Sequence, residues 1–529
     1  MTRLVLVLAV VMVAGCSSTP PRGSRPAAGN PAGYRVHVLT GDSLGAADVT
    51  INGLAIDGSS VDAIETSVQA ILNDDHAPPT VVETTGVPPD LAVDFTGAAT
   101  PVPSTFYGAN LQWRSKFFLK NPRWRALVAH MKLAILRFPA GQERVRYDGK
   151  DSVAGTPESD TLKVTADQPF EFRLSGEDVA NYVALCRELG IAAQPELNLT
   201  NDNPAMWADL VRQIVNDLGY DLQYLSIGNE PDNESVNGNW PYLGAVGATE
   251  RERRANALAH YVERYRAYRQ AIDAVKPGLI DAYGELARWA PVDQLGANLD
   301  AILADLGTVQ PGAVAIHWYM LGQWNGQLAS DPWYPRIDHL VVTGNDNNNI
   351  AYLATIVATL RDRVAAHGLS HARLFLDEFG TSWSATPADA AMADRLAAAL
   401  FNAEAQETGK AAGLDAMEWY GLSDPTLFAP WVPGLIGVDD ATGTPHPRPQ
   451  YYVYLLYKHL YGDETVPVPH GRQPDWSIYA SRGAGKSYLL LINRTASSTV
   501  TRVVQVTTAA GQRLLRLTLA PHALSIVAF

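Results

Sequence analysis

Between residues 104 and 448, short apolar runs alternate with longer segments in which apolar residues recur every three to four positions. The runs have the length of strands, and the longer segments have the periodicity of amphipathic helices. Eight strands are expected, at 106–110, 133–138, 191–197, 224–229, 279–285, 314–319, 374–378 and 416–420. The expected helices include 176–189, 204–218, 251–275, 350–366 and 387–407. Eight consecutive βα units predict the α/β class and a (β/α)8 TIM barrel. An open doubly wound sheet has the same alternation, but no glycine-rich phosphate-binding turn follows an early strand.

A different pattern follows the barrel. A helix is expected at 450–460, and strands at 476–480, 487–493, 500–507, 513–519 and 523–529 then follow one another without a helix between them. Short alternating strands separated by turn residues predict a C-terminal β-sandwich over 449–529. Residues 34–103 contain strand patterns at 34–39, 48–51 and 91–95 and a helix pattern at 61–72, but no motif that indicates a role. The last of these strands could pair with the sandwich.

The first 33 residues have the features of an export signal and a tether. Arg3 precedes a ten-residue apolar run, which is too short to cross a bilayer because a span needs about 20 residues. The run ends in Val13-Ala14-Gly15-Cys16, which resembles a bacterial lipobox, in which the cysteine becomes the lipidated first residue. Residues 17–33 are rich in Pro, Gly and Ser, so we expect a flexible tether. The prediction is an extracytoplasmic lipoprotein anchored to a membrane through Cys16, and the alternative is an ordinary secretory signal.

Charge and composition exclude several classes of protein. The 55 Asp and Glu residues outnumber the 41 Lys and Arg residues, and the net charge of −14 argues against nucleic acid or acidic membrane surfaces as main partners. Twelve Trp and 22 Tyr residues, together with carboxylates, suit a site for a neutral, polyhydroxylated ligand. Two cysteines cannot form a disulfide framework, and Cys186 lies in a helical pattern as a small buried residue.

Two glutamates are expected at the same end of the barrel. The fourth strand leads into Asn229-Glu230-Pro231, and Glu378 ends the seventh. Reactive groups of such barrels lie at the C-terminal ends of the strands, where strands four and seven are nearly opposite. Two carboxyl groups about 5–5.5 Å apart hydrolyse glycosidic bonds with retention. We therefore expect Glu230 to be the acid/base and Glu378 the nucleophile, with the Asn229 amide near the 2-hydroxyl of the sugar.

These motifs together resemble clan A of the retaining (β/α)8 glycoside hydrolases. The resemblance rests on Asn229-Glu230-Pro231, on Glu378 and on His317-Trp318-Tyr319 at the end of the sixth strand. Within the clan, the run 136–141 (LRFPAG) and the sandwich are similar to the arabinofuranosidases, the β-xylosidases and the heparanase/β-glucuronidase group. The tyrosine-rich run 451–457 followed by Tyr461-Gly462 is similar to the entry into the heparanase-type sandwich. The likeness covers residues 105–529.

The resemblance implies further site residues. Tyr319 matches a tyrosine that hydrogen-bonds the nucleophile, and His317 matches its neighbour in the same subsite. Arg137 matches a basic residue that supports the nucleophilic carboxylate, and Trp419 is placed like the ring on which the sugar stacks. Asn110 and Asn198, with Glu196, Trp113 and Trp324, fall near the same rim as weaker candidates for substrate contacts. The sequence departs from the heparanase-like group because Arg144 and Arg146 do not form an identifiable cluster for a uronate carboxyl.

Other assignments compete with this one. Glu285 ends the fifth strand and Glu418 lies in the eighth, although neither follows an Asn. Glu418 and Trp419 point to opposite faces of one strand, so at most one of them faces the barrel interior. A metal-dependent hydrolase would need clustered histidines, and the 12 His residues form no His-x-His or His-Glu-x-x-His motif. The alternative function is a noncatalytic carbohydrate-binding lipoprotein.

The predicted activity is a retaining glycoside hydrolase that cleaves a β-glycosidic or arabinofuranosidic bond of a polysaccharide or oligosaccharide by double displacement. It requires no cofactor and no metal, because two carboxyl groups and water suffice for the reaction. The expected partners are a carbohydrate substrate and, through the lipid anchor only, a membrane. Patterns in the sequence leave open the identity of the sugar, the choice between endo and exo cleavage, and the oligomeric state.

Overall fold

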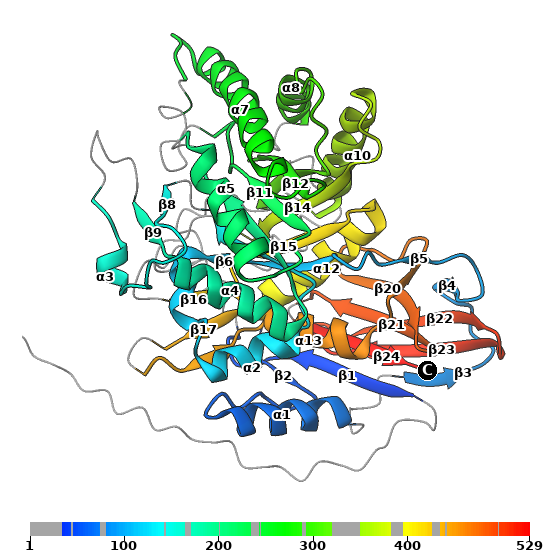
Figure 1. Cartoon of the computed structure of the whole chain (residues 1–529). Coiled ribbons are helices and arrows are strands. Elements are labelled where there is room, and N and C mark those ends of the chain that lie inside the picture. The colour runs from blue at the N-terminus through cyan, green and yellow to red at the C-terminus, as the bar shows by residue number, and fades with distance from the viewer. Residues whose placement is uncertain are drawn as a thin grey trace, which may run out of the picture.

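The computed structural model describes residues 34–43, 46–74, 81–141, 144–163, 171–199, 202–233, 243, 245–287, 292–319, 350–381, 395–425, 434–439, 442–495 and 497–529. The predicted leader with Cys16, the predicted tether and Trp324 lie outside these residues. The described residues form a barrel and a two-sheet sandwich that lie side by side (Figure 1). None of the helices described in these ranges is both long enough and apolar enough to cross a membrane.

Eight parallel strands form a closed barrel, in the order β10-β11-β12-β13-β14-β15-β6-β7. The strands are β6 (Tyr107–Gln112), β7 (Ile135–Ala140), β10 (Ala192–Leu197), β11 (Tyr224–Ile227), β12 (Ile280–Leu286), β13 (Ala313–Tyr319), β14 (Arg373–Gly380) and β15 (Ala416–Tyr420). Each of the eight predicted strands is confirmed, and the closure excludes the open doubly wound sheet. Chain order and spatial order agree around the ring, as short right-handed crossovers require.

Helices surround the barrel (Figure 1). They are α2 (Pro122–Met131), α4 (Gly176–Leu189), α5 (Pro204–Arg212), α7 (Glu250–Asp273), α8 (Val292–Leu303), α10 (Ile350–Ala366), α12 (Leu396–Ala412) and α13 (Tyr451–Leu460). Local sequence signals set several ends. Helix α4 begins at a capping box formed by Ser175 and Asp178 and ends at Gly190, whose φ of 66° suits glycine. The predicted helix at 204–218 is α5 followed by one π turn at 213–217.

The inner face of the barrel follows from the alternation of side chains along each strand. A separate apolar layer fills the interior, formed by Ile135, Ala282, Ala313, Ala315, Phe375 and Ala416. Side chains two positions apart on a strand share a face, so Arg137 after Ile135, His317 after Ala315 and Glu418 after Ala416 also point into the barrel. The small alanines leave room for these longer side chains. The barrel interior is therefore apolar at one level and strongly polar above it.

The strand β14 departs from this alternation. Its register against β13 shifts between Ala315 and His317, and its register against β15 shifts between Leu376 and Phe379. Such a bulge re-aims side chains, because one extra residue is inserted opposite the neighbouring strand. As a result, the consecutive carboxyls of Asp377 and Glu378 both lie close to the inward-facing His317.

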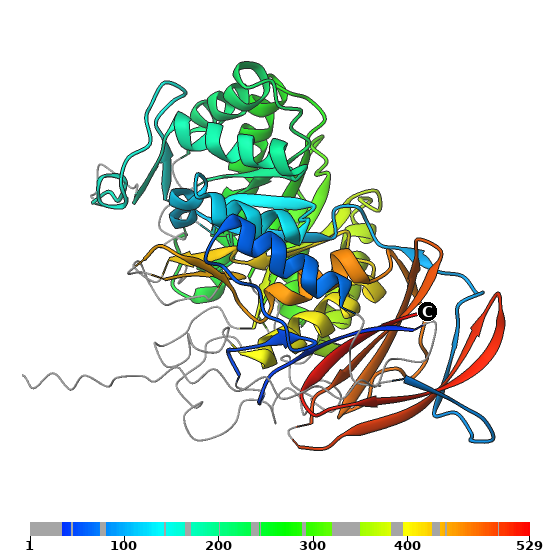
Figure 2. The same cartoon turned by 90° about the horizontal axis from the view of Figure 1, so that it is seen from below.

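The sandwich combines both ends of the chain. One sheet has the order β2-β1-β24-β21-β20-β19-β5 and the other β3-β23-β22-β4. The C-terminal strands are β19 (Glu464–Val466), β20 (Trp476–Gly483), β21 (Lys486–Asn493), β22 (Val500–Thr508), β23 (Gly511–Leu519) and β24 (Ala523–Ala528). The N-terminal strands are β1 (Arg35–Thr40), β2 (Thr50–Ile51), β3 (Val81–Thr84), β4 (Leu91–Asp94) and β5 (Thr100–Pro101). Residues 34–103 thus supply strands to both sheets, and β1 lies along β24 (Figure 2).

The sandwich is joined to the barrel through α12 and α13. Helix α13 packs against α12, α2 and β24, and α12 is buried along most of its length. Glu404 of α12 forms an ion pair with Arg494 that is fully buried, and it also accepts a hydrogen bond from the Tyr479 hydroxyl. A buried ion pair with additional hydrogen bonds fixes geometry, since breaking it leaves an uncompensated charge. These contacts join α12 to β20 and to the residue that follows β21.

Candidate active site

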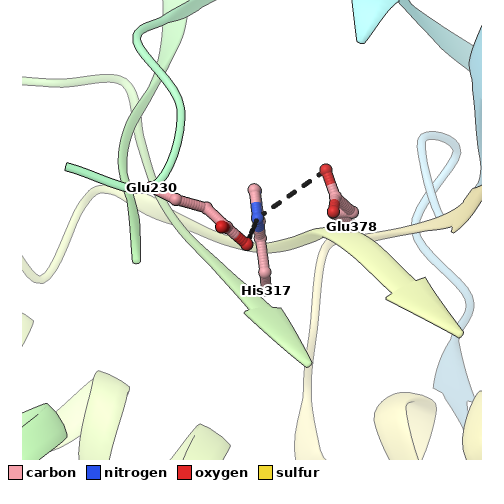
Figure 3. Close-up of side chains that lie close together, drawn as sticks. All are labelled: Glu230, His317 and Glu378. Carbon is pink, nitrogen blue, oxygen red and sulfur yellow. Dashed lines mark hydrogen bonds and ion pairs between the residues drawn. The ribbon is translucent and has the colours of Figure 1, made fainter. Parts of the chain in front are cut away.

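Glu230 and Glu378 meet at the C-terminal end of the barrel strands. Glu378 lies within β14, and Glu230 follows the end of β11 by three residues. Both residues are buried, with exposed fractions of 7% for Glu230 and 6% for Glu378. One carboxylate oxygen of each and a ring nitrogen of His317 all lie within 4.8 Å of one another. The two carboxyls face each other across His317 (Figure 3).

The turn after β11 holds Glu230 in an uncommon backbone conformation. Glu230 has a φ of 44°, and Gly228 just before it has a φ of 91°. A left-handed conformation in a residue other than glycine persists only where its surroundings enforce it, and it is frequent at functional sites. Here the backbone N–H of Glu230 donates to the carbonyl oxygen of Glu285 at 3.0 Å, which ties the turn to β12.

His317 connects the two glutamates. Its Nδ1 lies 3.0 Å from Oε1 of Glu230 and 3.7 Å from Oε2 of Glu378 (Figure 3). Complete burial lowers the pKa of His317 to about 4. The imidazole is therefore neutral at ordinary pH, and it contributes a hydrogen bond rather than a positive charge to the pair.

Two donors hold the carboxylate of Glu378. The Tyr319 hydroxyl donates to Oε1 at 2.5 Å, and Nη1 of Arg137 donates to Oε2 at 3.1 Å. Burial and the neighbouring charge of Glu378 raise the pKa of Tyr319 well above its usual value, so the phenol keeps its proton. Donors on both oxygens fix the orientation of the carboxylate.

Arg137 is fully buried and links the strands under the site. Besides Glu378, its guanidinium donates hydrogen bonds to Oδ1 of Asn110 at 3.0 Å and to Oδ1 of Asn229 at 2.8 Å. It also donates to Oε2 of Glu285 and lies 3.1 Å from Oε2 of Glu196. Burial alone would lower the pKa of Arg137, but the surrounding carboxylates raise it well above the usual value. It therefore remains charged and satisfies several acceptors at once.

Three further carboxyls lie below the pair inside the barrel. Glu285, Asp377 and Glu418 are completely buried, and burial raises the pKa of each well above its usual value. Within the described part of the chain, neither oxygen of Glu418 has a hydrogen-bond partner. Protonation is the response of a buried carboxyl that lacks sufficient compensation.

Two groups of side chains have the composition and spacing to ligate a metal ion. They are Glu230, His317 and Glu378, and Glu285, His317 and Asp377, and in each group the possible ligand atoms lie within 4.8 Å of one another. Arg137 contacts one carboxylate of each group. A cation in either group would therefore be next to an existing positive charge, which opposes its binding.

The structure brings together six of the residues expected from the sequence. Glu230, Glu378, His317, Tyr319 and Arg137 form one connected network, and Asn229 joins it through Oδ1. Oδ1 of Asn229 accepts from Arg137, so the amide nitrogen points away from Arg137. A contact from that nitrogen to a sugar hydroxyl would need this orientation.

The expectation for Trp419 is wrong. Its ring is 1% exposed and packs against Phe379 at 5.2 Å and against Phe401 of α12 at 6.2 Å between ring centroids. It faces the helices, so it cannot stack on a sugar in the barrel. Because Ala416 is in the interior layer, alternation along β15 places Glu418 inside and Trp419 outside. The inward aromatic residue is Tyr420, whose ring lies edge-on to Tyr319 at 6.2 Å.

Asn110 and Asn198, which were expected at the rim, are buried and donate hydrogen bonds to backbone oxygens of other segments. Asn110 is inaccessible, and its Nδ2 donates to the backbone oxygens of Asp377 at 2.8 Å and Glu418 at 3.2 Å. Asn198 is 2% exposed, and its Nδ2 donates to the carbonyl oxygen of Val145 at 3.1 Å. Polar side chains at strand ends also satisfy backbone groups of neighbouring strands, and that role prevails here.

The weaker candidates are also accounted for. Trp113 is buried, and its indole N–H donates to the Arg173 carbonyl oxygen at 2.6 Å, whereas Glu196 accepts a hydrogen bond from the Gly141 N–H at 2.8 Å. Arg146 donates to Asp148 at 2.6 Å, and Arg144 lies 4.0 Å from Glu171. Asn233 was not expected from the sequence, and its Nδ2 donates to Oε2 of Glu230 at 2.9 Å. The only sequence feature that could have indicated this contact is the position of Asn233, three residues after Glu230.

No protein-family model matches the chain, and no curated protein matches its sequence. Solved structures share its fold. The α-L-arabinofuranosidase from Thermotoga maritima, in complex with arabinose, is 12% identical with a TM-score of 0.58, covering 84% of this chain and 100% of that one. A family 51 α-L-arabinofuranosidase from Bifidobacterium longum is 14% identical with a TM-score of 0.60 and the same coverage. A family 44 xyloglucanase from Paenibacillus polymyxa is 13% identical with a TM-score of 0.55, covering 83% and 98%. The likeness shows the barrel-and-sandwich fold that the clan A resemblance implies.

Proposed function

We propose that this protein is a retaining glycoside hydrolase that cleaves a β-glycosidic or arabinofuranosidic bond by double displacement. The observation that carries the proposal is the approach of Glu230 and Glu378, whose nearest carboxylate oxygens lie within 4.8 Å. Retaining enzymes hold their two carboxyls about 5–5.5 Å apart, whereas inverting enzymes hold them about 6.5–9.5 Å apart to admit a water molecule. The spacing supports the covalent route.

In the first step, Glu378 attacks the anomeric carbon while Glu230 gives its proton to the departing oxygen. The bond from the anomeric carbon to that oxygen breaks, and an ester bond to Glu378 forms. In the second step, Glu230 takes a proton from water, the water oxygen attacks the anomeric carbon, and the ester bond breaks. Glu230 ends protonated and Glu378 ionised, as both began.

The surrounding residues support these steps. Tyr319 and Arg137 each donate a hydrogen bond to Glu378 and hold its carboxylate oriented for the attack. His317 remains neutral because its pKa is about 4, so it does not replace Glu230 as the proton donor. Asn229 is held by Arg137 beside the acid/base, where its amide can serve the 2-hydroxyl of the sugar.

The substrate is proposed to be a carbohydrate. The structural neighbours named above are arabinofuranosidases and a xyloglucanase, and a barrel of the same fold supports a substrate of the same chemical class. Fold alone does not select the sugar, because specificity depends on loops and hydroxyl contacts around the shared carboxyl pair. A panel of aryl glycosides (glucuronide, xyloside, arabinofuranoside, galactofuranoside and glucoside) identifies it.

The decisive experiment uses Glu378→Ala with the best substrate of that panel. We expect turnover to be lost, and azide to restore part of it with a glycosyl azide of inverted anomeric configuration as the product. Glu263→Ala, at an exposed position of α7, is the matched control and should retain full activity. If azide restores nothing, Glu378 is not the nucleophile. If the wild type binds sugars yet releases no reducing ends, the protein is a noncatalytic carbohydrate-binding lipoprotein.

We also propose that the protein is exported and anchored by a lipid on Cys16. Arg3, the apolar run and the tetrad ending at Cys16 support this proposal. The test is metabolic labelling with a radioactive fatty acid in a bacterial host. Label should enter the wild type and be absent from Cys16→Ser, which should also leave the membrane fraction. Equal labelling of both proteins would contradict the anchor.

A further inference from the structure

We propose that Asn233 is a positioning residue for the acid/base: it holds one oxygen of Glu230 so that the transferable proton is carried by the other. The inference rests on the proposed function and extends it to a residue that neither the motif nor the fold assigns. Asn233 contacts Glu230 and acts through it.

Each oxygen of Glu230 has a different partner. Nδ2 of Asn233 donates to Oε2 at 2.9 Å, and Nδ1 of His317 lies 3.0 Å from Oε1. An amide nitrogen can only donate, whereas a neutral imidazole nitrogen either donates or accepts according to its tautomer. The carbonyl oxygen of a carboxylic acid is a better acceptor than its hydroxyl oxygen, so the Asn233 amide favours Oε2 as the carbonyl oxygen and Oε1 as the oxygen that carries the proton.

The oxygen left to carry the proton faces the reaction site. Oε1 is the oxygen joined to His317, and His317 Nδ1 is also 3.7 Å from Oε2 of Glu378. Figure 3 shows this oxygen on the side of Glu230 that faces Glu378. Oε1 therefore borders the space between the two carboxyls, where the departing oxygen of a substrate would lie.

The backbone around Asn233 is held independently of its side chain. The backbone N–H of Asn233 donates to the carbonyl oxygen of Glu230 at 3.0 Å. Asp232 accepts hydrogen bonds from the N–H of Ala287 and from Nδ2 of Asn298, both at 2.9 Å. Because these contacts tie the turn to the end of β12 and to α8, Asn233→Ala should remove the amide without unfolding the turn.

Asn233 also affects when Glu230 ionises. A donor aimed at a carboxylate favours its charged form. Without the amide, Glu230 should keep its proton to higher pH. Asn233→Asp should act in the same direction and more strongly, because a second carboxylate beside Glu230 opposes its ionisation.

The test compares the wild type with Asn233→Ala and Asn233→Asp on two aryl glycosides, one with a phenol of high pKa and one with dinitrophenol as leaving group. For Asn233→Ala, kcat on the poor leaving group should fall about tenfold, with little change for dinitrophenol and in KM. The basic limb of the pH–rate profile should move up by about one pH unit. Asn203→Ala, which removes the N-cap of α5, is the control and should leave the limb unchanged.

Two outcomes overturn the inference: a pH profile of Asn233→Ala that superimposes on the wild type, or equal losses on both leaving groups with an unmoved basic limb. A second measurement needs no substrate. The Glu230 carboxyl can be titrated by 13C NMR after glutamate labelling, with Glu230→Gln identifying its signal. An identical titration in the wild type and Asn233→Ala overturns the inference. The wild type could also hydrolyse no glycoside while the two titrations differ as expected. That result would overturn the proposed function and leave the role of Asn233 standing.

Discussion

Tyr319 donates its hydroxyl hydrogen to Oε1 of Glu378 at 2.5 Å, from a strand that also carries His317. The two residues are separated by one position on β13, so their side chains point to the same inner face. His317 reaches Glu230 and Tyr319 reaches Glu378. One strand therefore contacts both carboxyls.

The first prediction concerns this contact. Tyr319→Phe removes the hydroxyl and keeps the ring. A hydrogen bond to a charged group contributes about 1.5–3 kcal/mol, so kcat/KM should fall by about ten- to a hundredfold. Steady-state kinetics on an aryl glycoside provides the measurement. Tyr283→Phe is the control, because that hydroxyl donates to the Ile302 carbonyl oxygen on the outer side of the barrel. Equal losses in the two variants would show a general structural effect.

The second prediction assigns the acid role. Glu230→Ala removes the proposed proton donor, so substrates that need protonation of the departing oxygen should lose about 10²–10⁴-fold in rate. Activated aryl glycosides, whose leaving groups depart without a proton, should lose far less in the first step. A plot of log kcat/KM against leaving-group pKa should therefore become steeper. If all substrates lose activity equally, Glu230 is not the acid.

The third prediction concerns stability and pH. Burial raises the pKa of Glu418 well above the usual value of about 4.3. Between those two pKa values the folded state holds a proton that the unfolded state has released, so stability falls as pH rises, by about 1.4 kcal/mol per pH unit for this group. Glu418→Gln removes this dependence. Its melting temperature should match the wild type near pH 4 and exceed it at pH 8.

The control for that experiment is Glu188→Gln, since Glu188 is exposed on α4. Its melting temperature should follow that of the wild type at every pH. Thermal unfolding by circular dichroism from pH 4 to pH 8 measures both variants. A Glu418→Gln profile parallel to the wild type would mean that Glu418 is compensated and ionised in the folded protein.

The fourth prediction separates Trp419 from Tyr420. Trp419 packs between Phe379 and Phe401 outside the barrel, so Trp419→Ala should destabilise the protein by about 3–5 kcal/mol. The milder Trp419→Phe should leave KM unchanged. Tyr420→Ala, on the inner face, should instead raise KM with a smaller effect on unfolding. A large rise in KM for Trp419→Phe would restore the stacking role to Trp419.

Much of the site is predictable because it depends on strand ends. Glu230, Glu378, His317, Tyr319 and Arg137 all lie at or just beyond the C-terminal ends of barrel strands, which local patterns locate. Once the barrel is predicted, geometry brings those ends together. Trp419 shows the limit. Both phases of alternation along β15 fit the sequence, and only the packing of α12 selects the one that turns the indole outward.

The amino-acid sequence by itself determined the eight barrel strands, the C-terminal strands and the position of both glutamates, because those features depend on periodicity over a few residues. The tertiary structure alone decided which strands of residues 34–103 pair with the sandwich, that a bulge in β14 turns Asp377 and Glu378 to one side, and that Asn233 reaches Glu230. These features depend on contacts between segments far apart in the chain. Their free energies are set by closure of the barrel and by packing against neighbours, which no local pattern records.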